Sequence, residues 1–164
     1  MNPSPLFATA VAAAFAAVAC GSNPSTPAID PYAGNPTPAA SAEPGTTIML
    51  RSSNLGQILV DGSGRTIYLW EVDKSSRSNC YDACRNAWPP VLTTGKPLAG
   101  AGINASLLGT SARTDGQLEV IYNGHPLYYF IADKKAGDTT GQGINNFGGP
   151  WYVLDPSGNK VDKS

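Results

Sequence analysis

The fold is decided by a stretch that occurs twice, Gly56–Lys74 (GQILVDGSGRTIYLWEVDK) and Gly116–Lys134 (GQLEVIYNGHPLYYFIADK). The copies align over 19 positions without a gap, at an offset of 60 residues, and seven positions are identical. The identical pairs are Gly56/Gly116, Gln57/Gln117, Val60/Val120, Gly64/Gly124, Tyr68/Tyr128, Asp73/Asp133 and Lys74/Lys134. Such self-similarity predicts a duplicated supersecondary unit whose copies pack against each other and share one interior.

Each copy has the pattern of a β-hairpin. In the second copy, LEVIY and HPLYYFI flank Asn123-Gly124, the dipeptide favoured where both central turn residues need positive φ. In the first copy, QILV and TIYLW flank a looser turn at residues 61–64. A third hairpin is expected near the end, where WYVL and NKV flank residues 155–158, and residues 47–51 (TIMLR) are expected to add a strand.

Helical signals are few. Ser78-Asn79 predicts the N-terminal cap of a short helix that ends near Trp88, because the Pro89-Pro90 pair stops it. Asn104 predicts the cap of a single turn that reaches Leu108.

Composition agrees with this reading, because glycine (18) and proline (14) are frequent and only 14% of residues are charged. We therefore expect a mainly β protein, in which residues 46–164 form one small antiparallel β domain with one or two short helices. Its two repeated hairpin units are expected at about residues 55–90 and 115–155.

The N-terminal segment has the pattern of a signal peptide, expected at residues 1–19. Its apolar run of 14 residues, Leu6–Ala19, is shorter than the roughly 20 residues of a membrane-spanning helix. The run ends in Ala17-Val18-Ala19 followed by Cys20, which resembles a bacterial lipobox. In lipoproteins this cysteine carries acyl chains such as palmitate and becomes the mature N-terminus. Ordinary secretion is the alternative, because the same tripeptide suits a signal peptidase.

Residues 20–45 are expected to be the lipidated cysteine and a disordered tether rich in Pro, Ser and Ala. Cys80 and Cys84 can pair with each other, which would leave Cys20 as an odd free thiol unless it is lipidated. Two or three acyl chains make a durable anchor. The sequence therefore predicts a lipoprotein of the cell envelope, anchored to the membrane on its extracytoplasmic side.

Charge and histidine content limit the partners. Eleven Lys and Arg against twelve Asp and Glu give a net charge of −1, which argues against a nucleic-acid partner. The single histidine, His125, rules out a multi-histidine metal site within one chain. We expect no cofactor and no resident metal; the expected partners are the membrane, through the anchor, and an envelope protein or the cell wall.

The chain resembles the bacterial secreted-repeat lipoproteins with a Tyr-x-x-x-x-Asp motif. The residues that carry this resemblance are Leu55–Asp61, Tyr68, Asp73, the string Cys80-Tyr-Asp-Ala-Cys84-Arg-Asn-Ala-Trp88-Pro89-Pro90, Tyr128–Asp133 and Trp151. The similarity covers about residues 55–155, and the cysteine–tryptophan–proline string is its most specific element. It implies an envelope lipoprotein of unknown biochemical function and adds no activity.

The Cys80/Cys84 pair allows two interpretations. An exported protein favours a disulfide, and four residues of helix would separate the two Cα atoms by about 6 Å. Alternatively, Cys-x-x-x-Cys resembles the copper-binding pair of the Sco-type assembly proteins, which would make this a copper or thiol-redox handling protein. Those proteins have a thioredoxin-like fold, which this sequence does not predict, and a histidine ligand, for which only His125 is present.

No catalytic constellation is recognisable, so we expect a non-enzymatic binding or interaction module with an unknown ligand. The recurring aspartates, Asp73 and Asp133, are typical of strand-end residues that accept backbone N–H groups. Alternatively, they converge on one cleft whose walls are tyrosines. The candidate ligand-binding residues are Tyr68, Asp73, Tyr128, Asp133, His125, Trp88 and Trp151.

Overall fold

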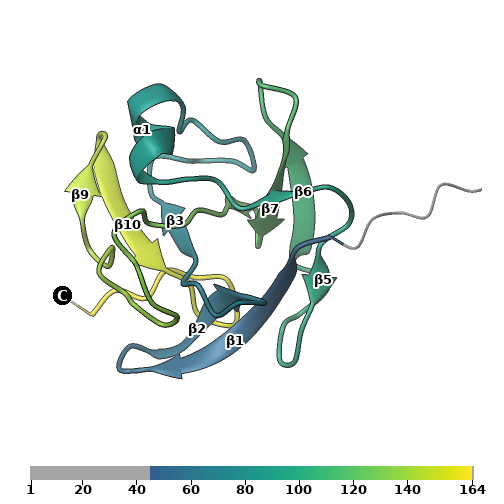
Figure 1. The fold of residues 1–164 in the computed structure, drawn as a ribbon, viewed down its shortest axis with the longest axis vertical. Coiled ribbons are helices and arrows are strands. Elements are labelled where there is room, and N and C mark those ends of the chain that lie inside the picture. The colour runs from purple at the N-terminus through teal and green to yellow at the C-terminus, as the bar shows by residue number, and fades with distance from the viewer. Residues whose placement is uncertain (1–44, 164) are drawn as a thin grey trace, which may run out of the picture. The chain divides into compact units, whose positions relative to one another are not determined.

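The computed structural model describes residues 45–163, so the expectations for the signal peptide, Cys20 and the tether lie outside the described residues. Within this range the chain forms ten short strands and one helix (Figure 1). The elements are β1 (Thr47–Ser53), β2 (Gly56–Asp61), β3 (Tyr68–Trp70), α1 (Asp82–Ala87), β4 (Leu92–Thr93), β5 (Leu98–Ala99), β6 (Leu108–Ala112), β7 (Leu118–Tyr122), β8 (His125–Pro126), β9 (Asn145–Asn146) and β10 (Gly149–Val153).

The strands form three small sheets in the described part of the chain. Their orders are β2-β1-β5, β3-β10-β9 and β4-β7-β6, with β8 paired to β7. Every pair is antiparallel except β1 with β5. The expected mainly β, antiparallel domain with a short helix is therefore confirmed, and so is the strand expected at residues 47–51.

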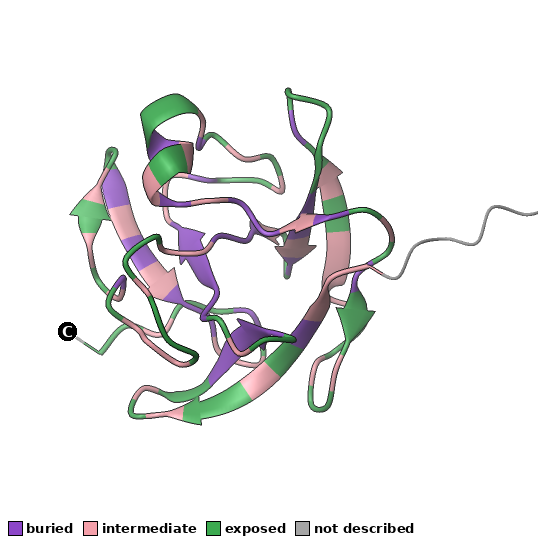
Figure 2. Ribbon diagram, in the orientation of Figure 1, coloured by how far each residue is buried: buried purple, intermediate pink, exposed green. Residues whose placement is uncertain are grey.

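The two repeats meet at Tyr68 and Tyr128. The backbone N–H of Tyr68 donates to the carbonyl of Tyr128 at 2.8 Å, and the reverse bond is 2.9 Å long. This reciprocal pair relates the repeats by a local twofold axis. Buried residues gather around it, most visibly along β3 (Figure 2). Two hydrophobic clusters form the core, and each contains residues from both repeats, so the copies do share one interior.

A stack of four aromatic rings crosses the first cluster. Trp70 lies 4.9 Å from Trp151, Trp151 lies 4.0 Å from Trp88, and Trp88 lies 4.3 Å from Phe130, measured between ring centroids. The rings alternate between the first and second repeat, which follows from the twofold relation. Trp88 and Trp151, in the middle of the stack, have no exposed surface. They supply the large buried area that a small β domain needs.

The alignment of the two repeats at a constant offset of 60 is wrong before the hairpin turns, where the structural offset is 61 residues. The first turn has three central residues, since Asp61 N–H donates to the carbonyl of Arg65 at 2.9 Å. The second has two, Asn123 and Gly124, with φ values of 49° and 80°. The extra residue makes Leu59 the counterpart of Val120, and these two share the second cluster. Val60, the expected counterpart, packs in the first cluster. After the turns, the offset of 60 holds.

The helix begins later than expected. α1 covers Asp82–Ala87, and Tyr81 at its N-cap makes no capping hydrogen bond through its side chain. Ser78, the expected cap, instead has a hydroxyl that accepts the backbone N–H of Cys80 and donates its own proton to the Tyr128 hydroxyl oxygen, because the Tyr128 proton is donated to Asp73. The single turn expected from Asn104 is present at residues 105–107, where the Asn104 carboxamide oxygen accepts the Ser106 N–H at 3.0 Å; it does not continue into a helix, and Leu108 begins β6.

The C-terminal hairpin is confirmed. Leu154 bridges Lys160, and the N–H of Gly158 donates to the carbonyl of Asp155 at 2.9 Å. Gly158 has a φ of +81°, which glycine adopts without a steric penalty. This hairpin brings Asn159 and Lys160 next to the turn between β7 and β8, where the candidate site lies.

A candidate ligand-binding cavity around His125

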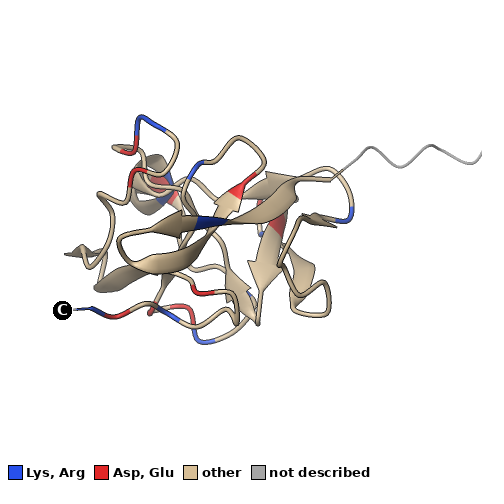
Figure 3. Ribbon diagram, turned by 90° about the horizontal axis from the view of Figure 1, so that it is seen from below, with Lys and Arg blue, Asp and Glu red and all other residues tan. Residues whose placement is uncertain are grey.

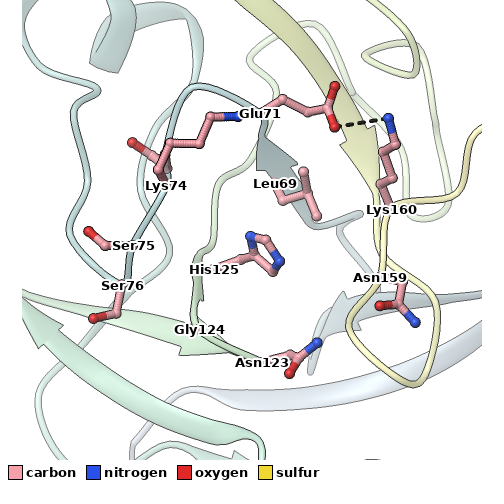
Figure 4. Close-up of a pocket in the computed structure, with 11 residues that line it drawn as sticks. Leu69, Glu71, Lys74, Ser75, Ser76, Asn123, Gly124, His125, Asn159 and Lys160 are labelled. Carbon is pink, nitrogen blue, oxygen red and sulfur yellow. Dashed lines mark ion pairs between the residues drawn. The ribbon is translucent and has the colours of Figure 1, made fainter.

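A cavity of about 630 Å³ opens beside His125 (Figure 4). Three segments that are distant in the sequence enclose it: β3 with the loop that follows, the β7–β8 turn, and the C-terminal hairpin. The residues that line it include Leu69, Glu71, Asp73, Lys74, His125 and Lys160. Apolar and polar groups therefore meet in one concave place, as is usual for small-molecule sites.

His125 is central to the cavity. Its imidazole projects into the space between Leu69 and the β7–β8 turn (Figure 4). Neither ring nitrogen has a hydrogen-bond partner within residues 45–163. Burial lowers the pKa of His125, and the carboxylates of Asp73 and Glu71 oppose this only in part. The ring is therefore neutral at pH 7, with both nitrogens open to a ligand.

The charged groups of the cavity are balanced. Glu71 and Lys160 form an ion pair of 2.9 Å at the rim, and both side chains are about one-third exposed (33% and 38%). The Lys160 ammonium also lies 4.8 Å from the centre of the Tyr152 ring. Charged residues elsewhere in the described domain are scattered along the chain, with both signs interspersed (Figure 3). The cavity thus presents polar groups without a strong field of one sign.

The two Tyr–Asp pairs are reciprocal between the repeats. The Tyr68 hydroxyl donates to Asp133 at 2.7 Å, and the Tyr128 hydroxyl donates to Asp73. The other oxygen of each carboxylate accepts loop N–H groups, at Asn79 for Asp73 and at residue 140 for Asp133. Burial raises the pKa of both tyrosines above the ordinary value, so both hydroxyls stay protonated and act as donors.

This pairing separates the two aspartates. Asp73 contributes to the wall of the cavity, but its carboxylate is already occupied by Tyr128 and Asn79. Asp133 lies in the other half of the domain and does not line the cavity. The structure therefore places Asp73 and His125 together and leaves Asp133 apart.

The other expected site residues lie in the interior. Tyr68, Tyr128, Trp88 and Trp151 are fully buried. Cys80 and Cys84 form a disulfide with a Cα–Cα distance of 5.2 Å; Cys80 is fully buried and Cys84 nearly so. The carbonyl of Cys80 accepts a hydrogen bond of 2.7 Å from the buried guanidinium of Arg113. The disulfide thus pins the loop that leads from the cavity wall into α1.

The twofold counterpart of the cavity is closed. There, the Arg65 guanidinium lies 3.7 Å from the centre of the Tyr129 ring, and the Tyr129 hydroxyl donates to Asp61 at 2.9 Å. Arg65 remains exposed to solvent over the partly buried Tyr129 ring, and the loop after Tyr129 is joined to the first turn, since Gly137 N–H donates to the carbonyl of Gly64 at 2.9 Å. The Arg65 and Tyr129 side chains therefore occupy, in one half of the domain, the volume that is open as the cavity in the other half.

Sequence reasoning missed Leu69, Glu71 and Lys160 as cavity residues. The repeat itself contained a usable signal, since the offset of 60 after the turn pairs Leu69 with Tyr129 and His125 with Arg65. In both pairs the larger side chain belongs to the closed half. The contribution of Lys160 had no such signal, because the C-terminal hairpin lies outside the repeated stretch.

Comparison with known proteins gives one match. A family model described as a secreted repeat of unknown function matches residues 49–92 and 109–155, together more than half of the chain. No curated protein and no solved structure matches. Among residues 45–163, no helix is long and apolar enough to cross a membrane. The two matched segments coincide with the two halves of the domain, and the chain belongs to this family of secreted repeats of unknown function.

Proposed function

We propose that this protein is a lipid-anchored envelope lipoprotein whose β domain is a non-enzymatic module that binds a small ligand in the cavity around His125. The extracytoplasmic location agrees with membership of a secreted-repeat family. Anchoring through Cys20 rests on the lipobox-like sequence Ala17-Val18-Ala19-Cys20.

One observation carries the binding role: the repeats are alike in backbone and differ in whether this place is filled. Arg65 and Tyr129 close it in one half. Leu69 and His125 leave it open in the other. Proteins usually fill such volumes with side chains. The fold can accommodate a tyrosine ring at this position, as Tyr129 shows, so the open volume results from the choice of leucine at residue 69.

The chemistry of the lining supports binding rather than catalysis. General acid–base work needs a carboxylate or histidine within reach of a proton that it can exchange. Asp73 is occupied by Tyr128 and Asn79, and Glu71 is paired with Lys160. His125 has open nitrogens, but no carboxylate within residues 45–163 is hydrogen-bonded to its ring. These groups can orient a ligand through hydrogen bonds.

The binding role is tested by NMR, because His125 is the only histidine of the chain and its ring protons are therefore unambiguous reporters. The chain is titrated with a library of sugars, amino acids, short peptides and aromatic compounds. We expect at least one member to move the His125 Hε1 resonance. We also expect Leu69→Tyr, which copies the closed half, to abolish the effect, and the size-matched Leu69→Met to preserve it. A library that leaves the resonance unmoved would contradict the proposal.

The anchor is tested separately in bacterial cells that express the full chain. An alkyne-tagged fatty acid should label the wild-type chain and leave a Cys20→Ser variant unlabelled. Labelling that is equal in both, or absent from both, would leave secretion without an anchor as the correct description of the N-terminus.

A further inference from the structure

The closed half of the domain indicates what the open half can hold. After the turn, residues 60 apart occupy equivalent places: Trp70 and Phe130 accept the N–H groups of Asp73 and Asp133, at 3.1 and 3.2 Å. The cavity therefore corresponds to the volume that the Tyr129 ring and the Arg65 guanidinium occupy in the other half of the domain. There the guanidinium carbon of Arg65 lies 3.7 Å from the centre of the Tyr129 ring.

We propose that the cavity binds a planar aromatic ring of about the size of a phenol, stacked on the imidazole of His125 above Leu69. This inference rests on the proposed function and names the class of its ligand. The ligand ring takes the place of the Tyr129 ring, which has no counterpart in the open half because Leu69 stands there. His125 takes the place of Arg65 and supplies the flat partner.

The remaining lining suits this occupant. Leu69 is 3% exposed and gives an apolar floor. The imidazole of His125 is flat and projects into the middle of the space (Figure 4). Ring pairs of this kind prefer offset-stacked or edge-to-face contacts and contribute roughly 0.5–1.5 kcal/mol beyond their buried area.

The rim of the cavity is polar, which determines the substituents that a bound ligand ring can have. The Glu71–Lys160 ion pair and the side chains of Asn123 and Asn159 face the opening. These groups can bond a hydroxyl, an amide or a peptide backbone attached to the ring. A free phenolic compound and the tyrosine side chain of a peptide both have such a ring with polar substituents. Comparing the affinities of the two distinguishes them.

The test titrates the chain with four probes while the His125 Hε1 resonance is followed. The aromatic probes are p-cresol and the peptide N-acetyl-Gly-Tyr-Gly-amide. The non-aromatic controls are cyclohexanol, of similar size, and N-acetylglucosamine. We expect both aromatic probes to move Hε1 upfield through the ring current and to saturate. We expect the controls to cause no saturable shift.

Variants locate the effect. Leu69→Tyr should weaken binding of p-cresol about tenfold or more, because the introduced ring occupies the volume. Leu69→Met should bind as the wild type does. His125→Ala, which removes the flat partner without adding bulk, should also weaken p-cresol binding by calorimetry, which guards against a misfolded Leu69 variant. Tighter binding of the tyrosine peptide than of p-cresol would identify a protein partner as the source.

The outcomes separate this inference from the proposed function. Saturable binding of N-acetylglucosamine or cyclohexanol with no binding of the aromatic probes would overturn the aromatic ligand and leave the cavity as a binding site. Aromatic probes that bind without moving His125, or that bind Leu69→Tyr as well as the wild type, would overturn the placement. If no probe and no library member moves His125, both proposals fall together.

Discussion

Single side chains connect the two repeats. Tyr68 donates its hydroxyl to Asp133, and Tyr128 donates to Asp73, so each motif is completed only by the other copy. The sequence identified these residues by their recurrence and predicted that the aspartates accept loop N–H groups. The cross-repeat bonds could not be predicted, because a fixed spacing within each copy does not indicate which carboxylate a tyrosine reaches.

We expect Tyr128→Phe to destabilise the domain more than Tyr68→Phe does. Each hydroxyl has a second partner, Ser78 for Tyr128 and the Gly141 N–H for Tyr68. The carboxylates differ, because Asp73 is 4% exposed whereas Asp133 is only partly buried. A hydrogen bond to a charged group contributes about 1.5–3 kcal/mol. Urea unfolding of the two variants measures the difference in the free energy of unfolding. Equal losses, or a larger loss for Tyr68→Phe, would contradict this ranking.

His125 should titrate below its ordinary pKa of 6.5, because burial disfavours the charged ring. A folded-state pKa below the unfolded value means that the contribution of His125 to stability is present above pH 6.5. It is lost as the pH falls through the folded-state pKa. The Hε1 chemical shift, followed from pH 8 to pH 4, measures this value. A midpoint at or above 6.5 would show that the ring is not partly buried.

At the scale of elements, the hairpin turns explain both what could and what could not be predicted. Asn123-Gly124 and residues 155–158 were recognisable as turns from their composition, and both are turns in the structure. The extra residue in the first turn shifts the register of β2 against β7 by one position. As a result Glu119, buried in β7, stands where β2 has Ile58. Pairwise identities could not reveal this shift.

Glu119 and Arg113 form a buried ion pair of 2.7 Å that joins β7 to the loop of Cys80. Glu119→Ile, which copies the counterpart Ile58, should destabilise the domain by at most about 3–5 kcal/mol, because it leaves the buried Arg113 guanidinium with only the longer ion pair to Asp115, at 3.6 Å. Replacing both partners, in Arg113→Leu/Glu119→Ile, should recover most of this loss. Thermal and urea unfolding of the single and double variants check it. A double variant as unstable as the single one would contradict the argument.

At the scale of the whole molecule, the domain is two copies of one unit that share an interior, and one of their differences is the side chain at residue 69 or 129. Duplication, the mainly β class and the shared core followed from the 60-residue repeat. The cavity could not be predicted from the repeat. It exists because Leu69 and His125 stand where the other half of the domain has Tyr129 and Arg65, and because the C-terminal hairpin forms one of its walls. Differences in packing between equivalent positions of the two repeats can be recognised only from the three-dimensional structure.

The most direct test is the NMR spectrum of Leu69→Tyr without any ligand. If the cavity is the open counterpart of the Tyr129 place, the introduced phenol ring lies against His125 and moves its Hε1 resonance upfield, while the domain stays as stable as the Leu69→Met variant. A folded Leu69→Tyr protein whose His125 resonance is unchanged would mean that the two places are not equivalent. The cavity would then not be the open counterpart of the volume that the Tyr129 ring occupies.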